Sequence, residues 1–395
     1  MSFEVKGWCP GALRPMQSGD GLVLRIRPNG GRLTQAQALT VADVSKAHGN
    51  GIIDLSIRGN VQLRGLSEAT HPHAIDALRE VGLVDADPAT ETRRNIMVTP
   101  FADAETDRLA NALAHALAQA GALSELPGKF GFAIDTGEAP VLTQSPADIR
   151  LERDRTGALL VRAEGVAQGV KVGAGDAVTV LLAMAKWFVA AGGIHEGRGR
   201  MASLTAAGVT PDGALTADCL PAQPAAPALP GNTAQGILVA FAFGQLNSET
   251  LTALAALGDL RVTPWRMVLV EGLQDIKSLN TVPGAIARPD APLLRVVACV
   301  GKPSCPQALG ETRELAKALA PNVRQGERLH VSGCAKGCAW PMTADKTLVA
   351  TATGYAFVEN GTARDTAEIE IMSHRPRDLA RLIAEKSEAE NDNAL

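Results

Sequence analysis

Four cysteines stand in two tight pairs, and their spacing constrains the fold more than any other feature of the chain. Cys299 and Cys305 form a C-x5-C pair in ACVGKPSCPQA, whereas Cys334 and Cys338 form a C-x3-C pair in HVSGCAKGCAWP. An iron–sulfur cluster needs four converging thiolates, which two short loops can supply. Four thiolates also bind zinc, but structural zinc sites usually use closer pairs than C-x5-C. The pattern therefore favours a 4Fe–4S cluster over zinc, and over unligated thiols.

Composition narrows the class of protein. Of the 395 residues, 46% are hydrophobic and only 3% are aromatic, so a core of aliphatic side chains is expected. The net charge of −4 argues against non-specific nucleic-acid binding. The opening residues lack the pattern of a signal peptide, and no stretch approaches the roughly 18–20 apolar residues of a membrane span. We expect a cytoplasmic location without membrane contact, where six cysteines indicate metal or redox chemistry.

A proline-rich segment, residues 219–232, divides the chain into two parts that begin alike. Residues 20–66 and 236–273 each read as strand, helix and strand, and each is followed by a longer α/β stretch. We interpret this as an internal duplication, although such units are also common in unrelated proteins. The predicted fold is α+β, with two small duplicated units and two larger α/β domains. The predicted boundaries are 1–88 and 233–290 for the small units, 89–218 and 291–386 for the α/β domains, 219–232 for the linker and 387–395 for a tail.

Polar and aliphatic residues alternate strictly over residues 53–64, which predicts one strand with a polar face. Such a face is usually solvated, and Gly59-Asn60 could instead form a hairpin turn that splits the strand. Arginine binds carboxylates through two parallel hydrogen bonds, so several arginines on one sheet suit a polyanionic ligand. The candidates on this sheet are Arg25, Arg27, Arg58, Asn60, Gln62 and Arg64. Further cationic candidates are Arg93, Arg94, Lys129, His195, Arg198, Arg200 and Arg266, each of which alone is more often a surface residue.

These segments resemble the sirohaem-dependent nitrite and sulfite reductases. ACVGKPSC and HVSGCAKGC look like the cluster signature of that family. IRGNVQL is similar to its R-x-T-x-Q strand, TRRNIMVTP to its R-N-V segment and LPGKFGF to its LPRKFK segment. The resemblance covers nearly the whole chain. It implies two ferredoxin-like half-domains and two α/β domains related by a pseudo-two-fold axis.

The resemblance also implies roles for individual residues. The four paired cysteines would hold a 4Fe–4S cluster, and by position Cys338 is the one that bridges to sirohaem iron in the reductases. Here it is expected only to ligate the cluster. The implied catalytic residues are Arg58, Arg94 and Lys129. The implied substrate-binding residues are Arg25, Arg27, Asn60, Gln62, Arg64, Arg198, Arg200 and Arg266.

Three departures from the reductase pattern bear on the activity. Gly131 stands where the reductases carry a second lysine, Gly128 where they carry the arginine of LPRKFK, and Asn60 where they carry threonine. Without those cations, a site is poorly equipped to hold and protonate a small oxyanion. The opening GWCPGALRPMQSGDGLVLRIRP instead resembles a branch of the family that takes a reduced tetrapyrrole as its substrate.

That branch implies an oxygen-dependent monooxygenase of aerobic cobalamin synthesis. Precorrin-3A and O2 would be the substrates; the meso position between rings A and D is hydroxylated, and the ring A acetate closes to a γ-lactone to give precorrin-3B. The arginines would bind the substrate carboxylates, and the cluster would pass on electrons from an external donor protein or reductase. Two alternatives stay open: a sirohaem-dependent nitrite or sulfite reductase, and a non-catalytic tetrapyrrole-binding or electron-carrier protein.

The branch is also associated with a mononuclear non-haem iron. His71, His73 and Asp76 are the nearest approach to its two-histidine, one-carboxylate ligand set, although a polar helix start on the surface explains them as well. Cys9, beside Trp8 and Pro10, is a further candidate site residue or a small hydrophobic residue without a special role.

Overall fold

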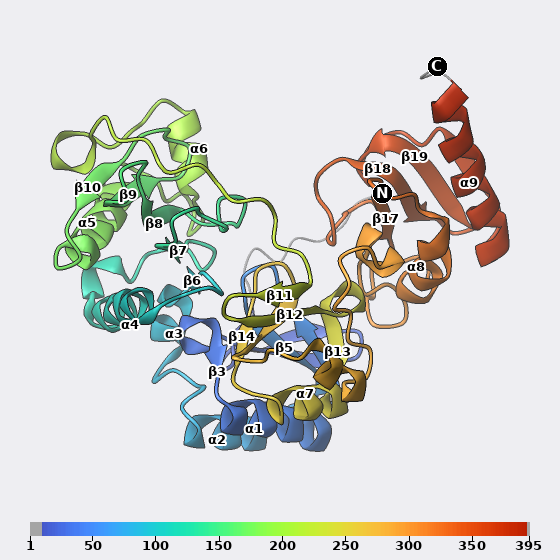
Figure 1. Ribbon diagram of the computed structural model, residues 1–395, viewed down its shortest axis with the longest axis horizontal. Helices are drawn as coiled ribbons and strands as arrows, with labels where there is room; N and C mark the ends of the chain where they lie inside the picture. The colour runs from blue at the N-terminus through green and yellow to red at the C-terminus, as the bar shows by residue number, and fades with distance from the viewer. Residues whose placement is uncertain (1–9, 393–395) are drawn as a thin grey trace.

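The computed structural model describes residues 10–392, with side chains as far as residue 384. Cys9 lies outside the described residues. Four five-stranded sheets, arranged as two similar pairs, form the framework of the described part of the chain (Figure 1). Among the described residues, no helix combines the length and the apolar character that crossing a membrane requires.

Two sheets form the central unit, which lies at the bottom of Figure 1. Each sheet contains strands from both halves of the chain. The first sheet has the order β1 (Met16–Ser18), β2 (Gly21–Ile26), β5 (Val61–Leu66), β4 (Ile52–Leu55) and β13 (Gln245–Asn247). The second has the order β11 (Gly231–Thr233), β12 (Gly236–Ala240), β15 (Met267–Glu271), β14 (Leu260–Val262) and β3 (Arg32–Leu33). Each half of the chain therefore donates one short edge strand to the sheet of the other half.

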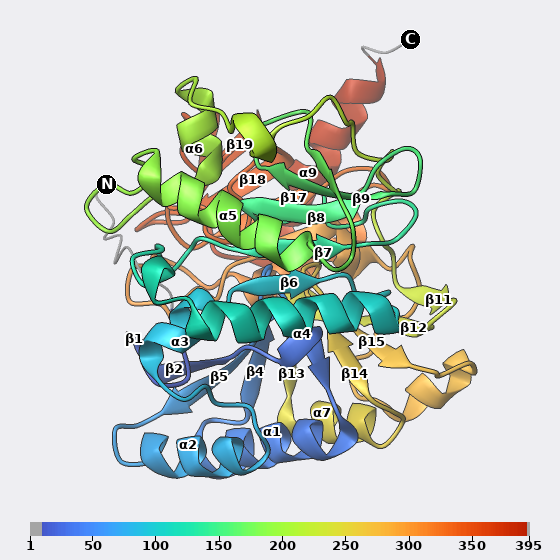
Figure 2. The ribbon, with the colours of Figure 1, turned by 90° about the vertical axis from the view of Figure 1, so that its left-hand side faces the viewer.

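Three helices cover one face of both central sheets: α1 (Gln35–His48), α2 (His71–Glu80) and α7 (Ser248–Ala255) (Figure 2). Helix α1 begins at a capping box, in which Thr34 and Gln37 satisfy each other's free backbone N–H groups. Aliphatic side chains from both halves of the chain form one buried cluster between these helices and the sheets. The two half-domains consequently share a core.

Each half also contributes an α/β domain, and the two domains have the same topology. The first comprises β6 (Ile96–Val98), β7 (Phe132–Asp135), β8 (Ile149–Arg153), β9 (Leu159–Ala163) and β10 (Val170–Val172), with helices α3 (Pro88–Arg93), α4 (Ala104–Gln119), α5 (Ala177–Ala190) and α6 (Met201–Ala206). The second comprises β16 (Val296–Ala298), β17 (Leu329–Ser332), β18 (Ala344–Ala350), β19 (Tyr355–Gly361) and β20 (Ile369–Ile371), with helices α8 (Arg313–Leu319) and α9 (Pro376–Asp392). In each, the first three strands are parallel and the last two pair antiparallel.

The duplication extends to single turns. The β4–β5 and β14–β15 connections are built alike: the Ser56 hydroxyl accepts two backbone N–H groups at 3.3 and 3.1 Å, and the Thr263 hydroxyl does the same at 3.3 and 3.2 Å. Gly59, at φ +64°, occupies the left-handed position of the first turn, and Arg266, at φ +59°, occupies that position in the second. The prediction of one continuous strand over residues 53–64 is therefore wrong, and the hairpin turn at Gly59-Asn60 is correct.

The predicted fold class, α+β with duplicated half-domains and two α/β domains, is confirmed by this arrangement. The domain boundaries stay a prediction. The tail predicted from residue 387 begins inside α9, which continues to Asp392.

Candidate active site

The cysteine pairs lie at the carboxyl ends of two adjacent parallel strands. Cys299 follows β16 directly, and the Cys334–Cys338 loop follows β17, so both loops emerge at the same edge of the sheet, where open α/β folds bind ligands. The N–H of Gly333 donates to the Cys299 sulfur at 3.2 Å. A Cβ atom on Gly333 would lie 2.8 Å from the Ala308 Cβ, so a glycine permits this close approach.

The pKa of Cys338 responds to the other three cysteines of the two pairs. Burial raises the pKa of the Cys338 thiol, the Lys336 ammonium lowers it, and the charges of Cys299, Cys334 and Cys305 raise it again. All four are free thiols. Neighbouring thiolate charges disfavour further deprotonation of the thiols. The positive charge of a bound metal centre would reverse this effect and favour the thiolate form.

The donor set fits an iron–sulfur cluster. All four donors are sulfur, and a backbone N–H already points at one of them, which is the kind of contact that tunes cluster potentials. Among the described side chains, residues 10–384, no three or more His, Cys, Asp or Glu stand close enough together to hold a metal ion. Cys299, Cys305, Cys334 and Cys338 are thus the residues that would hold a 4Fe–4S cluster.

A row of polar side chains crosses the first central sheet on the face opposite the helices. Arg25, Gln62, Asp54 and Gln245 stand in register on β2, β5, β4 and β13. Arg25 donates to the side-chain Oε1 of Gln62 at 2.6 Å, and Gln245 donates to Asp54 at 3.1 Å. The neighbours of these residues along the strands, such as Leu63, point to the aliphatic core instead.

The equivalent row of the second sheet has a different character. It consists of Leu238, Leu269, Arg261 and Arg32. Leu238 and Leu269 belong to a small apolar cluster that Trp265 helps to cover. Only the first sheet therefore presents a largely polar row.

Three of the candidate arginines are engaged by internal carboxylates. Arg64 contacts both oxygens of Asp20 at 2.7 Å, and these hydrogen bonds, with those from Asp54, raise its pKa despite the opposing effect of burial. Arg94 contacts both oxygens of Asp85 at 2.7 and 2.8 Å. The third pair joins Arg200 to Asp148 at 2.9 Å. The guanidinium groups of Arg64 and Arg94 are occupied within the fold, whereas Arg200 pairs with Asp148 through Nε alone. The ligand-binding roles of all three stay predictions.

Buried donors without a hydrogen-bond partner gather near the polar row. They are Nε of Arg27, Nδ2 of Asn60 and Nε of Arg313, whereas Nη1 of Arg27 is ion-paired with Glu91 at 3.2 Å. Arg27 and Asn60 lie side by side, because Ile26 pairs with Val61 in the sheet. Burial lowers the pKa of Arg27 to about 10, although Glu91 at 3.2 Å opposes the shift. Buried polar groups are nearly always satisfied in folded proteins, so unsatisfied donors here indicate a ligand rich in acceptors.

The remaining predicted cations differ in their surroundings. Arg266 is half-buried, and burial lowers its pKa, as does the neighbouring Arg313. Arg58 donates to the backbone carbonyl of Lys129 at 3.1 Å, which joins the β4–β5 turn to the first α/β domain. The side chains of Lys129 and Arg198 are exposed to solvent. Arg93 donates to the Thr90 hydroxyl and to the Ala118 carbonyl oxygen, each at 3.5 Å. Their roles stay predictions.

The position of Gly131 is closed by its neighbours. A Cβ atom there would lie 2.7 Å from the Asn95 side-chain nitrogen and 3.0 Å from the Asn95 carbonyl oxygen. The Gly131 N–H also donates to Asp148 at 2.9 Å. The structure therefore leaves no room for a lysine at this position unless Asn95 moves.

The candidate ligand set for a mononuclear iron is not brought together. His71 Nε2 contacts the Ala12 carbonyl oxygen at 2.8 Å, whereas His73 is exposed and stacks on His48. Asp76 pairs with Arg79 on the surface of α2. On one helix, residues two and five positions apart point in different directions, which is why the motif fails as a site.

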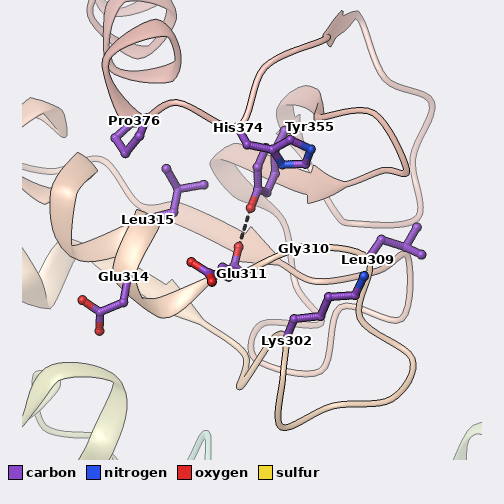
Figure 3. A pocket seen from close by; sticks show the side chains of 9 residues that line it. All are labelled: Lys302, Leu309, Gly310, Glu311, Glu314, Leu315, Tyr355, His374 and Pro376. Atoms are coloured by element: carbon purple, nitrogen blue, oxygen red, sulfur yellow. Dashed lines mark hydrogen bonds between the residues drawn. The ribbon is translucent and has the colours of Figure 1, made fainter.

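A cavity of about 390 Å³ lies on the second α/β domain, beside the Cys299–Cys305 loop (Figure 3). Tyr355 forms part of its lining, and its hydroxyl donates to the Glu311 carbonyl oxygen. Burial raises the pKa of Tyr355 to about 12, and the charges of Glu311 and Cys299 add to the shift. Lys302 and His374 also line the cavity.

The sequence reasoning missed the acidic partners Asp20, Asp54 and Asp85. Asp54 stands in the alternating segment with its partner Arg64, so the pattern already placed both on the polar face, but its partners Gln245 and Arg313 come from distant segments. Gln245 was missed because its short strand joins the sheet from the other half of the chain.

Comparisons with known proteins agree with this arrangement. Residues 14–81 match the family described as the nitrite/sulfite reductase ferredoxin-like half domain. The chain is 32% identical, over 391 residues, to a precorrin-3B synthase of a Sinorhizobium species, covering 91% of this chain and 83% of the relative. It is 27% identical to a ferredoxin–nitrite reductase of Synechococcus elongatus, covering 85% of this chain and 77% of the relative.

Among solved structures, the NirA protein of Mycobacterium tuberculosis is similar with a TM-score of 0.61, covering 92% of this chain and 79% of that one. At 17% sequence identity this likeness shows the fold alone. The chain belongs to the nitrite and sulfite reductase family, a family of oxidoreductase enzymes. Within that family it is similar over most of its length to precorrin-3B synthase, so the resemblance seen in the sequence is confirmed.

Proposed function

We propose that the chain is a monooxygenase that converts precorrin-3A to precorrin-3B in aerobic cobalamin biosynthesis. The similarity to a precorrin-3B synthase supports this substrate. The observation that carries the proposal is the set of unsatisfied buried donors of Arg27, Asn60 and Arg313 beside the polar row. A carboxylate-rich macrocycle supplies the acceptors that these groups lack.

In this proposal the chain's own residues bind and orient the macrocycle. Arg27 and Asn60 donate to carboxylates at one end of the β2–β5 pair, and Arg266 provides a cation from the matching turn of the second half. Because Arg27 is buried and Arg266 is half-buried, their charges are screened less by water and hold an anion more strongly than surface arginines do. Lys129 and Arg58 close the side that faces the first α/β domain.

In the oxygen insertion, one oxygen atom of O2 forms the C–O bond of the new hydroxyl group, and the other takes up two electrons and two protons and leaves as water. A 4Fe–4S cluster, when bound to the four cysteines, supplies electrons singly. An external donor protein is the proposed source of these electrons. The donor protein is proposed to contact the second α/β domain at the cavity lined by Lys302 and Tyr355, because this cavity lies beside the Cys299–Cys305 loop.

A second candidate function is a sirohaem-dependent nitrite reductase. The identity of 27% to a ferredoxin–nitrite reductase over 85% of this chain favours it. The closed position of Gly131 opposes it, since the second cation for a small oxyanion is missing there.

The experiment that tests the proposal starts with anaerobically purified protein. Visible and EPR spectra, with iron, sulfide and extracted tetrapyrrole quantified, should show about four sulfides per chain and no bound sirohaem. Addition of precorrin-3A with a chemical reductant should then cause O2 uptake and give a product one oxygen atom heavier. Stoichiometric sirohaem with nitrite-dependent oxidation of the reductant would establish the second candidate instead.

A further inference from the structure

Arg64 stands at the centre of a buried polar network on the first central sheet. Its guanidinium group contacts both oxygens of Asp20 at 2.7 Å, Oδ2 of Asp54 at 3.2 Å and the Ser18 hydroxyl at 3.1 Å. The residue is 5% exposed. We call Asp20, Asp54, Arg64 and Arg313 the Asp54 network.

One set of contacts leads from Arg64 to the loop of Cys305. The Ser18 hydroxyl accepts from Arg64 and donates to the carbonyl oxygen of Ser304 at 3.1 Å. The N–H of Gly19 donates to the same oxygen at 3.1 Å. A Cβ atom on Gly19 would lie 2.8 Å from that oxygen, so the β1–β2 hairpin is in direct contact with the residue that precedes Cys305.

A second set of contacts leads from Arg64 to Cys299. Oδ1 of Asp54 accepts from Nη2 of Arg313 at 3.2 Å, and Arg313 is the first residue of α8. The preceding residue, Thr312, is buried, and its hydroxyl donates to the Cys299 carbonyl oxygen at 2.5 Å. Arg64 is therefore connected to the Cys305 loop through Ser18. It is connected to Cys299 through Asp54 and the Thr312–Arg313 segment.

The other half of the chain contains an equivalent of the Asp54 network with its charges reversed. Arg261 stands at the sheet position of Asp54, and Glu271 stands at that of Arg64. Arg261 contacts Glu271 at 2.5 Å and Asp107 of α4 at 2.6 Å, as Asp54 contacts Arg64 and Arg313 of α8. Arg261 is as buried as Arg64, at 4% exposed, but its network ends in the α/β domain without the cysteine pairs.

We propose that Arg64 and Asp54 are positioning residues, which hold the Cys299 and Cys305 loops against the polar face of the first sheet. This rests on the proposed function in one respect, the presence of a cluster at the four cysteines. Removing one partner from a buried ion pair leaves the other charge uncompensated. The loops would then loosen together, because both are tied to the same guanidinium group. The network thereby fixes where electrons arrive relative to the bound macrocycle.

The test compares Arg64→Gln and Asp54→Asn with the matched control Arg261→Gln. In iron-free protein, mass spectrometry follows the alkylation rate of each cysteine. Arg64→Gln should speed the alkylation of Cys299 and Cys305 about tenfold, the effect of losing roughly one hydrogen bond of local stability. The control should leave these two rates unchanged, and Arg64→Lys should lie between wild type and Arg64→Gln.

In cluster-loaded protein, the same variants are compared by EPR-monitored redox titration and by the rate of iron loss to a chelator. Arg64→Gln should shift the midpoint potential and speed iron loss, and Arg261→Gln should do neither. If Arg64→Gln leaves the alkylation rates, the potential and the iron loss unchanged but weakens tetrapyrrole binding, Arg64 is a substrate ligand and the proposal fails. Equal effects of Arg64→Gln and Arg261→Gln would also overturn it, because they would show only general destabilisation.

Two further controls keep the outcome decisive. Should Arg64→Gln fail to fold, Ser18→Ala removes only the contact to Ser304, and it should speed the alkylation of Cys305 more than that of Cys299. The alkylation measurement needs no cluster. A wild-type protein that binds no cluster would therefore contradict the proposed function without deciding the role of Arg64, which the cysteine reactivities decide separately.

Discussion

At the scale of single residues, Arg266 combines a left-handed backbone with a half-buried guanidinium group. Its φ of +59° is a conformation that favours glycine, and Gly59 occupies the matching position of the first turn. Gly244 makes room for it, because a Cβ atom there would lie 2.4 Å from the Arg266 Cβ. Strain of this kind persists where function requires the residue.

Replacement of Arg266 by glycine should separate strain from binding. Arg266→Gly is expected to raise the free energy of unfolding by about 1 kcal/mol, because the backbone strain is relieved. Both Arg266→Gly and the control Arg266→Ala should weaken tetrapyrrole binding, measured by absorbance titration. Alanine keeps the backbone strain, so Arg266→Ala should not show the gain in the free energy of unfolding that urea unfolding reports for Arg266→Gly. Wild-type affinity in Arg266→Ala would show that this cation does not contact the ligand.

His330 on β17 is a second residue whose surroundings predict a measurable effect. Its side chain is fully buried, and neither ring nitrogen has a hydrogen-bond partner. Burial lowers the pKa of His330 to about 4, so the folded protein keeps the ring neutral while the unfolded chain takes up a proton near pH 6.5. Stability is thus complete above pH 6.5 and falls as the pH approaches 4.

The variant His330→Leu should lack this loss of stability. Wild type is expected to lose on the order of 2–3 kcal/mol through His330 between pH 6.5 and 4, and the leucine variant should lose correspondingly less. Urea unfolding of both proteins across this range checks the difference. If the two pH profiles run parallel, His330 is not the group that titrates.

At the scale of elements, the sequence predicts the order of strands and helices better than their turns. The alternation over residues 53–64 continues through the β4–β5 turn, so its period alone does not reveal the Ser56 hydroxyl bonds that reverse the chain. The cysteine loops were predictable, because paired thiols carry their own signal. The partners of Arg64 and Arg94 were not, since Asp20 and Asp85 meet them through the fold and not through any spacing.

Gly128 and Gly131, in the loop before β7, stand where the reductases carry cations for a small oxyanion, so substitutions there test whether this chain can bind such an anion. Gly131→Lys restores the lysine of the reductases, and the contact with Asn95 should cost about 1–3 kcal/mol of stability. We expect no gain in nitrite reduction with a reduced dye. Gly128→Arg is the matched control: its nearest neighbour would be a Thr92 methyl group at 3.3 Å, so it should fold with little loss. A stable Gly131→Lys protein that reduces nitrite would show that the position is open to a cation.

At the scale of the whole molecule, the two halves are interlocked. The first sheet is tied to α8 through Asp54 and Arg313, and the second sheet is tied to α4 through Arg261 and Asp107. Each sheet is therefore joined to the α/β domain of the other half, as the exchange of β3 and β13 already suggests. The Cys299–Cys305 loop, encoded near the end of the chain, consequently contacts residues encoded near its beginning.

This interlocking predicts an uneven response to iron removal. Chelation of the iron from cluster-loaded protein should increase hydrogen exchange at residues 299–310 and 333–343, because the loops lose their shared ligand. The increase should extend to residues 16–21 and to the start of α8, which contact the Cys305 and Cys299 loops. The equivalent loops of the first α/β domain, residues 99–104 and 136–142, should not respond. Mass spectrometry of hydrogen exchange checks all six regions in one experiment. A uniform increase would mean that the cluster stabilises the molecule as a whole, whereas protection of residues 16–21 in the iron-free protein would show that the hairpin and the Cys305 loop are independent.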